Sequence, residues 1–83
     1  MSETLIGTVT HYYGHIGVAG ISVSAPLTVG DTIHFVGATS NFTQPVESMQ
    51  IEHDKVEKVG PGDQIGLQVR DRVREHDQVF KVA

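Results

Sequence analysis

The segment from Val59 to Leu67 constrains the fold most strongly, because it joins two aliphatic runs through turn-forming residues. Pro61 fixes its own φ at a value that suits a turn, and Gly62 tolerates a positive φ. Asp63 can accept hydrogen bonds from backbone N–H groups before the chain extends again. The segment therefore predicts a reversal between two β-strands.

Two other segments repeat this arrangement. Val29-Gly30-Asp31-Thr32-Ile33 and Glu75-His76-Asp77-Gln78-Val79 also place an Asp two residues before an aliphatic residue, and a β-rich run follows each of them. Three such corners predict a small all-β domain whose strands start at Asp-bearing turns. The 83 residues suit one domain, residues 1–83, with a thin core, and a barrel suits that core because closure pairs the strand edges.

Apolar residues at every second position place the strands. We expect strands over residues 5–11, 16–23, 32–36, 46–53, 65–69 and 78–82. Leu5, Gly7 and Val9 are expected to share one face of the first strand. Inward positions are expected at Ala19, Ile21, Val23, Ile33, Phe35, Ile65, Leu67 and Val69, with His34 facing outward. The stretch from Tyr12 to His15 is expected to connect the first two strands, and Leu27 to fill the end of the barrel.

The segment 43–59 has two interpretations. Some of its apolar residues recur at spacings of three and seven, which is typical of a helix, namely Val46, Met49, Val56 and Val59. Against a helix, Gln44-Pro45 is a poor N-terminal cap and several of the apolar residues are β-branched. We favour an irregular strand over 46–53 followed by a polar turn at 52–55, and a short helix between Val46 and Val59 stays open.

Charge is distributed unevenly along the chain. The formal net charge of −4 argues against a protein that coats nucleic acid through bulk electrostatics. All six basic residues follow Asp54, and they are Lys55, Lys58, Arg70, Arg72, Arg74 and Lys81. A fold that brings some of them together would carry a local basic face, whereas the interleaved acidic residues favour an ordinary solvated surface.

Cysteine is absent, which excludes disulfides and thiolate metal sites and fits a reducing compartment. The first residues show no signal-peptide pattern, and no apolar run approaches the roughly 20 residues that a membrane-spanning helix needs. We therefore expect a cytoplasmic protein with no membrane partner.

No catalytic constellation is visible. The five His residues are scattered and lack a clear set of further ligands, so they do not indicate a zinc or copper site: His11, His15, His34, His53 and His76. Glu52, His53 and Asp54 are adjacent, and neighbours on a strand point to opposite faces. P-loop and nucleophile-elbow patterns are also missing. We expect no enzyme activity, no cofactor and no nucleotide.

Basic and aromatic residues form the strongest candidate site. In an extended segment Arg70, Arg72 and Arg74 would project from one side, and guanidinium groups suit bidentate phosphate contacts. Tyr12 and Tyr13 can stack on unpaired bases. The candidate RNA contacts are Arg70, Arg72, Arg74, Lys55, Lys58, Tyr12 and Tyr13. The alternative is that they are ordinary loop arginines and barrel-rim tyrosines.

Several short patterns occur in a fixed order along the chain. They are Gly7-x-Val9, Gly17-Val18-Ala19, Leu27-x-x-Gly30-Asp31-x-Ile33, Val46-x-Ser48-Met49 and Val59-x-Pro61-Gly62-Asp63-x-Ile65-Gly66-Leu67. With them, nearly the whole chain resembles the second domain of translation elongation factor Tu. The stretches 48–53, 56–58 and 77–82 make it more similar to stand-alone translation elongation factor-like proteins and to the C-terminal barrel of collagenase-like peptidase-family proteins.

This resemblance implies a six-stranded antiparallel β-barrel with Greek-key-like connections. It also implies a role in translation or RNA modification with tRNA or ribosomal RNA as partner, but not GTP hydrolysis, because the GTPase domain is missing. We expect a non-catalytic binding module that contacts RNA or a ribonucleoprotein. The alternative is a protein-interaction module that docks onto a collagenase-like peptidase-family or RNA-modification enzyme, through apolar rim residues such as Phe42 or Tyr13.

Overall fold

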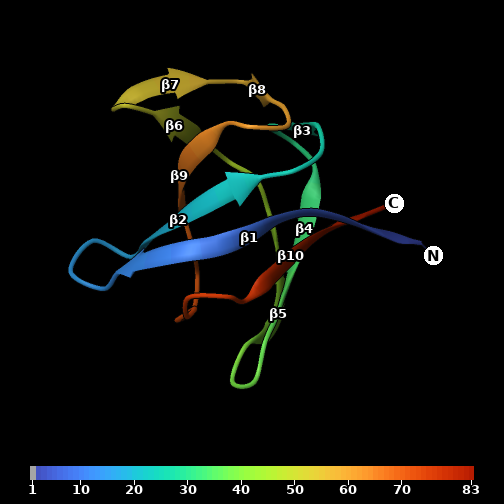
Figure 1. Cartoon of the computed structure of the whole chain (residues 1–83), viewed down its shortest axis with the longest axis vertical. Helices are drawn as coiled ribbons and strands as arrows, with labels where there is room; N and C mark the ends of the chain where they lie inside the picture. The colour runs from blue at the N-terminus through green and yellow to red at the C-terminus, as the bar shows by residue number, and fades with distance from the viewer. Residues whose placement is uncertain (1) are drawn as a thin grey trace.

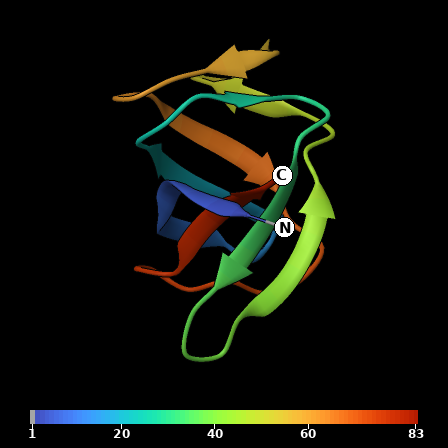
Figure 2. The same ribbon diagram turned by 90° about the vertical axis from the view of Figure 1, so that its right-hand side faces the viewer.

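Ten strands and no helix make up residues 2–83, the part of the chain that the computed structural model describes. The strands are β1 (Glu3–Tyr13), β2 (Val18–Val23), β3 (Leu27–Thr28), β4 (Thr32–Val36), β5 (Asn41–Pro45), β6 (Met49–Ile51), β7 (Asp54–Val56), β8 (Lys58–Val59), β9 (Gln64–Gln68) and β10 (Gln78–Val82). Eight of them form one antiparallel sheet in the order β5-β4-β10-β1-β2-β9-β6-β7, and β3 pairs with β8. The sheet curls into a barrel (Figures 1 and 2), which confirms the all-β prediction.

The strand count is higher than six because β3 forms a short strand before β4 and the region after β4 is divided into short pieces. A helix between Val46 and Val59 is excluded, since this segment contains only the short strands β6, β7 and β8, joined by a turn and a bend. The strand β5 is not among the predicted strands, because its polar sequence carries no aliphatic alternation. The predicted turn at 52–55 shortens to the two residues Glu52 and His53.

One apolar cluster fills the barrel, and it contains all the predicted inward residues. The buried apolar residues are Ile6, Val9, Ala19, Ile21, Val23, Leu27, Ile33, Phe35, Val46, Met49, Val59, Ile65, Leu67, Val69, Val73 and Val79. Leu27 is fully buried in the short β3, as predicted for a residue that fills the barrel end.

The prediction that Leu5 shares a face with Gly7 and Val9 is wrong. The pairing of β1 with β10 shifts by one residue between Leu5 and Gly7, so Ile6 turns inward with 1% exposure and Leu5 is 41% exposed. An extra residue in one strand reverses the alternation that follows it. Gly7 is needed at this bulge, because a Cβ there would lie 2.8 Å from the Ser22 carbonyl oxygen.

The three Asp corners have the same geometry. In each, the Asp N–H donates to the carbonyl three residues earlier, at 3.0 to 3.1 Å, and an Asp Oδ2 accepts from the N–H of that same residue, at 2.8 to 2.9 Å. The third residue has a positive φ in every case: 101° at Gly30, 93° at Gly62 and 76° at His76. These are the features of a type II turn with an Asp side chain closing it.

Each corner is also joined to a buried Val of a neighbouring segment. The N–H of the positive-φ residue donates to the Val carbonyl, and the Val N–H donates to the Asp carbonyl. The partners are Val46 for the Asp31 corner, Val23 for the Asp63 corner and Val9 for the Asp77 corner. The corners therefore start β4, β9 and β10 and at the same time fix them against the rest of the barrel.

A side chain closes the barrel where backbone pairing stops. Gln44 on β5 is 4% exposed, and its amide nitrogen donates to the Gln68 carbonyl at 2.9 Å. Its amide oxygen accepts from the Arg70 N–H at 2.8 Å. One buried amide group thus replaces a rung of the ladder between β5 and the end of β9. No helix that could cross a membrane occurs among residues 2–83.

Candidate functional site

The predicted arginine face does not form as an alternating strand. The connection from β9 to β10 is irregular, with Val69 and Val73 buried and residues 70–72 all exposed. Arg70 is held in an ion pair, with its Nη2 3.0 Å from Oε1 of Glu47. Arg72 and Arg74 are exposed, and within residues 2–83 they have no ion-pair partner.

The other predicted RNA contacts lie elsewhere. Lys55 is on β7 and Lys58 on β8, at the end of the barrel opposite to the β9–β10 connection (Figures 1 and 2). Tyr12 and Tyr13 belong to β1 rather than to a connection, and they face opposite sides. Tyr12 packs against the core, whereas Tyr13 is 49% exposed with its ring 4.3 Å from that of His11. The seven residues therefore do not share one surface.

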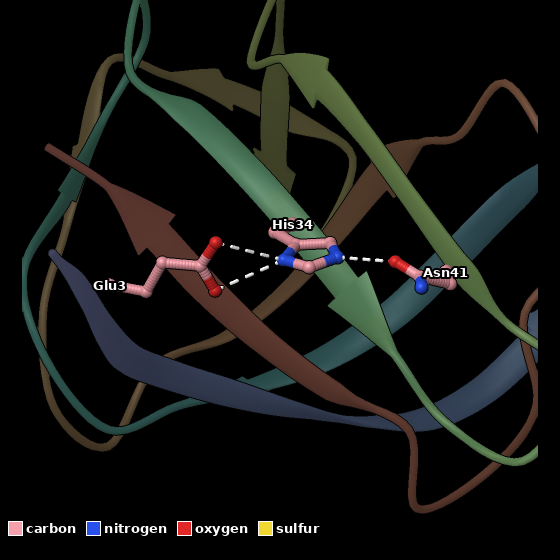
Figure 3. A network of polar contacts seen from close by, with 3 residues as sticks. All are labelled: Glu3, His34 and Asn41. Atoms are coloured by element: carbon pink, nitrogen blue, oxygen red, sulfur yellow. Dashed lines mark hydrogen bonds and ion pairs between the residues drawn. The ribbon is translucent and has the colours of Figure 1, made fainter. Parts of the chain in front are cut away.

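His34 is the histidine with the most defined surroundings (Figure 3). Its Nδ1 lies 3.0 Å from both carboxylate oxygens of Glu3, and its Nε2 lies 2.6 Å from Oδ1 of Asn41. Both neighbours accept, so the imidazolium form satisfies them best, and the hydrogen bonds to Asn41 and then Glu3 raise the pKa of His34. The three residues connect β1, β4 and β5 on the outside of the barrel, and both ring nitrogens are occupied, which indicates a structural role.

No group of three or more metal-ligating side chains is found in residues 2–83. The strongest candidate for binding is instead a hollow of about 410 Å³ on the outer face of four neighbouring strands, β1, β2, β9 and β6. These strands lie one above the other in Figure 1. We call this depression the glycine hollow. Its lining residues are Thr10, Tyr13, Ile16, Val18, Gly20, Ile21, Gln50, Glu52, His53, Gln64, Ile65 and Gly66.

The floor of the glycine hollow consists of two glycines that face each other across β2 and β9, Gly20 and Gly66. A Cβ added to Gly66 would meet only Cγ1 of Val18, at 3.5 Å, which is an ordinary contact, and no positive φ occurs there. The fold therefore does not require glycine at this position. Because glycine weakens a strand, a close approach of another molecule is the better explanation.

One rim of the glycine hollow is a strained turn. Glu52 and His53 occupy the centre of the two-residue hairpin between Ile51 and Asp54, with φ of 50° and 71°. Such hairpins favour Asn-Gly, and a residue with a Cβ costs roughly 1–2 kcal/mol in the left-handed region. Strain of this kind gathers at functional sites.

The opposite rim is apolar and exposed. Among residues 2–83 the exposed large apolar side chains are Leu5, Tyr13 and Ile16, and the last two both line the glycine hollow. Ile16 is 65% exposed, at the tip of the β1–β2 loop. Exposed apolar side chains that gather around one depression are typical of a protein-binding surface.

The sequence indicates only part of this site. It points to Tyr13, but nothing in it connects Ile16, Gly66 or the Glu52–His53 rim with that residue. A signal was present, because Gly66 interrupts the strand between Ile65 and Leu67 without being part of a turn. What could not be read from the sequence is that Gly20 lies beside Gly66.

Comparison with known proteins identifies the fold. A scan against models of protein families finds no match. Two solved structures match closely: the C-terminal domain of a putative U32 peptidase from Geobacillus thermoleovorans, and its selenomethionine variant. The first has a TM-score of 0.90 and 22% identity over 96% of this chain and 93% of that chain. The second has a TM-score of 0.87 and 22% identity over 90% and 95%.

This chain has the fold of a U32 peptidase C-terminal domain. Curated relatives agree with this: an uncharacterized protease of Methanocaldococcus jannaschii is 38% identical over 76 residues, covering 90% of this chain and 19% of the relative. A collagenase of Porphyromonas gingivalis is 32% identical over 81 residues, covering 95% and 22%.

The chain thus spans about a fifth of the length of the curated relatives that it matches. The findings support the predicted resemblance to the C-terminal barrel of collagenase-like proteins. They do not extend to the stand-alone translation elongation factor-like proteins.

Proposed function

We propose that this domain is a cytoplasmic, non-catalytic docking module for an enzyme of the U32-peptidase type, and that the glycine hollow binds a segment of that enzyme. The curated relatives are named protease and collagenase, and each is about five times longer than the matched segment. A barrel of this kind therefore occurs next to a much larger part of an enzyme chain.

The observation that carries this proposal is the exposure of Tyr13 and Ile16 at one depression. Burial of a large apolar side chain contributes about 1.5–3 kcal/mol, so two such residues are a substantial source of affinity. A non-catalytic role is supported by His34, whose ring nitrogens are both engaged by neighbouring acceptors.

Binding can be measured by calorimetry between this chain and a U32-peptidase-type protein of the same cells whose own chain lacks such a barrel. We expect association that survives moderate salt, because apolar contacts are not screened. Changing Tyr13 and Ile16 to Ser should weaken it by about tenfold or more, in line with the burial energy that is lost.

Leu5→Ser is the matched control, since Leu5 is also a large exposed apolar residue but lies outside the glycine hollow. This variant should bind like the wild type. Absence of association, or equal loss in the Leu5 variant and the double variant, would contradict docking through the hollow.

A second candidate function is contact with RNA, in translation or RNA modification. It is favoured by Arg72 and Arg74, which are exposed and without an ion-pair partner in the described part of the chain. Phosphate contacts of this kind weaken as the salt concentration rises, in proportion to the number of phosphates contacted, which distinguishes them from docking through apolar residues.

A further inference from the structure

We infer that the glycine hollow receives the side chain of an arginine on the docked segment. This inference rests on the proposed function and names the partner group that the site recognises. Its basis is the meeting of a carboxylate, several neutral acceptors, an aromatic ring and a flat glycine floor in one depression.

Charge and hydrogen-bonding groups in the hollow complement a cation. Glu52 supplies a carboxylate, while Thr10, Gln50 and Gln64 supply oxygens that can accept hydrogen bonds. No Lys or Arg is among the residues that line it, and Lys55 lies outside the lining, on β7 opposite Gln50. A guanidinium group carries five N–H donors and always bears its charge, so it can satisfy several of these acceptors at once.

The shape of the hollow favours a planar group on an apolar stem. The Gly20–Gly66 floor presents backbone without side chains, and Val18 and Ile16 border it with apolar surface. An arginine stem can lie along such surface while its charged end reaches the rim. Tyr13 places a half-exposed aromatic ring in the lining, and a guanidinium stacks on such a ring better than the compact ammonium of lysine.

The features that folding does not explain all serve this use of the site. A side chain at Gly66 would occupy the hollow, although the strand itself would tolerate it. The left-handed conformations of Glu52 and His53 keep both side chains at the rim despite their strain. Arginine recognition therefore accounts for a glycine that weakens its strand and for a turn built from unfavourable residues.

The test is a titration of the isotope-labelled 83-residue chain, followed by amide chemical shifts, with three capped tripeptides. Their central residues are arginine, lysine and citrulline, the last being an uncharged analogue of arginine. We expect saturable shifts at Gly20, Gly66 and Glu52 with the arginine peptide. The citrulline peptide should bind with an affinity at least about fivefold lower, because its charge-assisted hydrogen bonds are lost.

Three variants complete the experiment. Glu52→Gln should weaken the arginine peptide severalfold and leave citrulline binding unchanged. Gly66→Val should abolish binding while the melting temperature stays equal or rises, because valine suits a strand better than glycine. Gln68→Val is the control, since it also introduces a valine on β9, at an exposed position outside the hollow.

Equal binding of arginine and citrulline, shifts on another face of the barrel, or normal binding by Gly66→Val would each overturn the inference. These results are separable from the proposed function. If binding of the enzyme is lost in the Tyr13 and Ile16 double variant but is unchanged in Gly66→Val, docking through the hollow is supported and arginine recognition is excluded. If the arginine peptide binds the hollow while the enzyme does not, only the enzyme as partner is excluded.

Discussion

At the scale of single residues, the Asp corners contain an asymmetry that can be measured. Two of them place glycine at the positive-φ position, whereas the third places His76 there. An L-residue in the left-handed region costs roughly 1–2 kcal/mol, and glycine loses about 0.5–1 kcal/mol more backbone entropy on folding. At this positive-φ position, histidine therefore has a higher conformational free energy than glycine would have.

His76→Gly should therefore raise the free energy of unfolding by about 0.5 kcal/mol, the difference between these two terms. Gly62→Ala should lower it by the same amount, roughly 0.5 kcal/mol, since the same two terms act with opposite sign and no atom lies within 4 Å of the added Cβ. Urea denaturation measures both. Destabilisation by His76→Gly would show that the imidazole makes a compensating contact.

His34 makes stability depend on pH. Its pKa is raised by Asn41 and Glu3, so the stabilisation is fully present below the unfolded-state pKa of about 6.5 and is lost as pH rises through the raised folded-state pKa. The unfolding free energy of the wild type should fall relative to that of His34→Gln as the pH rises from about 6.5 through the raised folded-state pKa.

Denaturation of both proteins across this pH range gives the measurement. Asn41→Ala removes the larger cause of the pKa shift and should reduce the pH dependence without abolishing it. A constant difference between wild type and His34→Gln would mean that the histidine contributes only through packing.

At the scale of strands, the gap between β5 and β9 depends on one side chain. Gln44→Leu keeps the approximate volume but leaves the Gln68 carbonyl and the Arg70 N–H without their partner. Unsatisfied buried groups cost about 1–3 kcal/mol each, so we expect a loss of roughly 2–4 kcal/mol. Faster hydrogen exchange at the Arg70 amide should accompany it, while the Val79 amide in β10 serves as an internal reference.

The β6–β7 hairpin combines strain with a binding role. Replacing Glu52 and His53 with Asn and Gly should stabilise the domain by about 1 kcal/mol, since Asn-Gly suits the two positive-φ positions. The same change removes the carboxylate from the glycine hollow and should weaken the arginine peptide. Thermal melts test the stability of this variant, and the peptide titration tests its affinity for the arginine peptide. A variant that is more stable and binds the arginine peptide as tightly as the wild type would contradict a functional reason for the strain.

At the scale of the whole molecule, the basic residues are divided between the two ends of the barrel. RNA binding, if it is a function, should therefore involve few phosphates and show a shallow salt dependence. Changing Arg72 and Arg74 to Ala should lower the slope of log affinity against log salt by about 1 to 2, whereas Lys55→Ala with Lys58→Ala should leave it unchanged. Titration with tRNA provides the slopes, and no binding at low salt would exclude this function for that RNA.

The sequence alone predicted the parts of the fold that depend on neighbouring residues. The Asp corners follow from turn chemistry within four residues, and the inward faces of β4 and β9 follow from the alternation of Ile33 with Phe35 and of Ile65 with Leu67. The resemblance to the collagenase-type barrel also came from the order of these patterns. Each of these features depends on residues that are close together in the sequence, so it does not depend on how distant segments pair.

Tertiary structure decided whatever depends on which residue faces which across strands. The bulge that exchanges Leu5 for Ile6, the amide of Gln44 that closes the barrel, and the pairing of Gly20 with Gly66 all arise from the register between distant segments. A shift by one residue would place each of these side chains on the other face of the sheet. The glycine hollow joins residues from Thr10 to Gly66, so it exists only once β1, β2, β9 and β6 have paired.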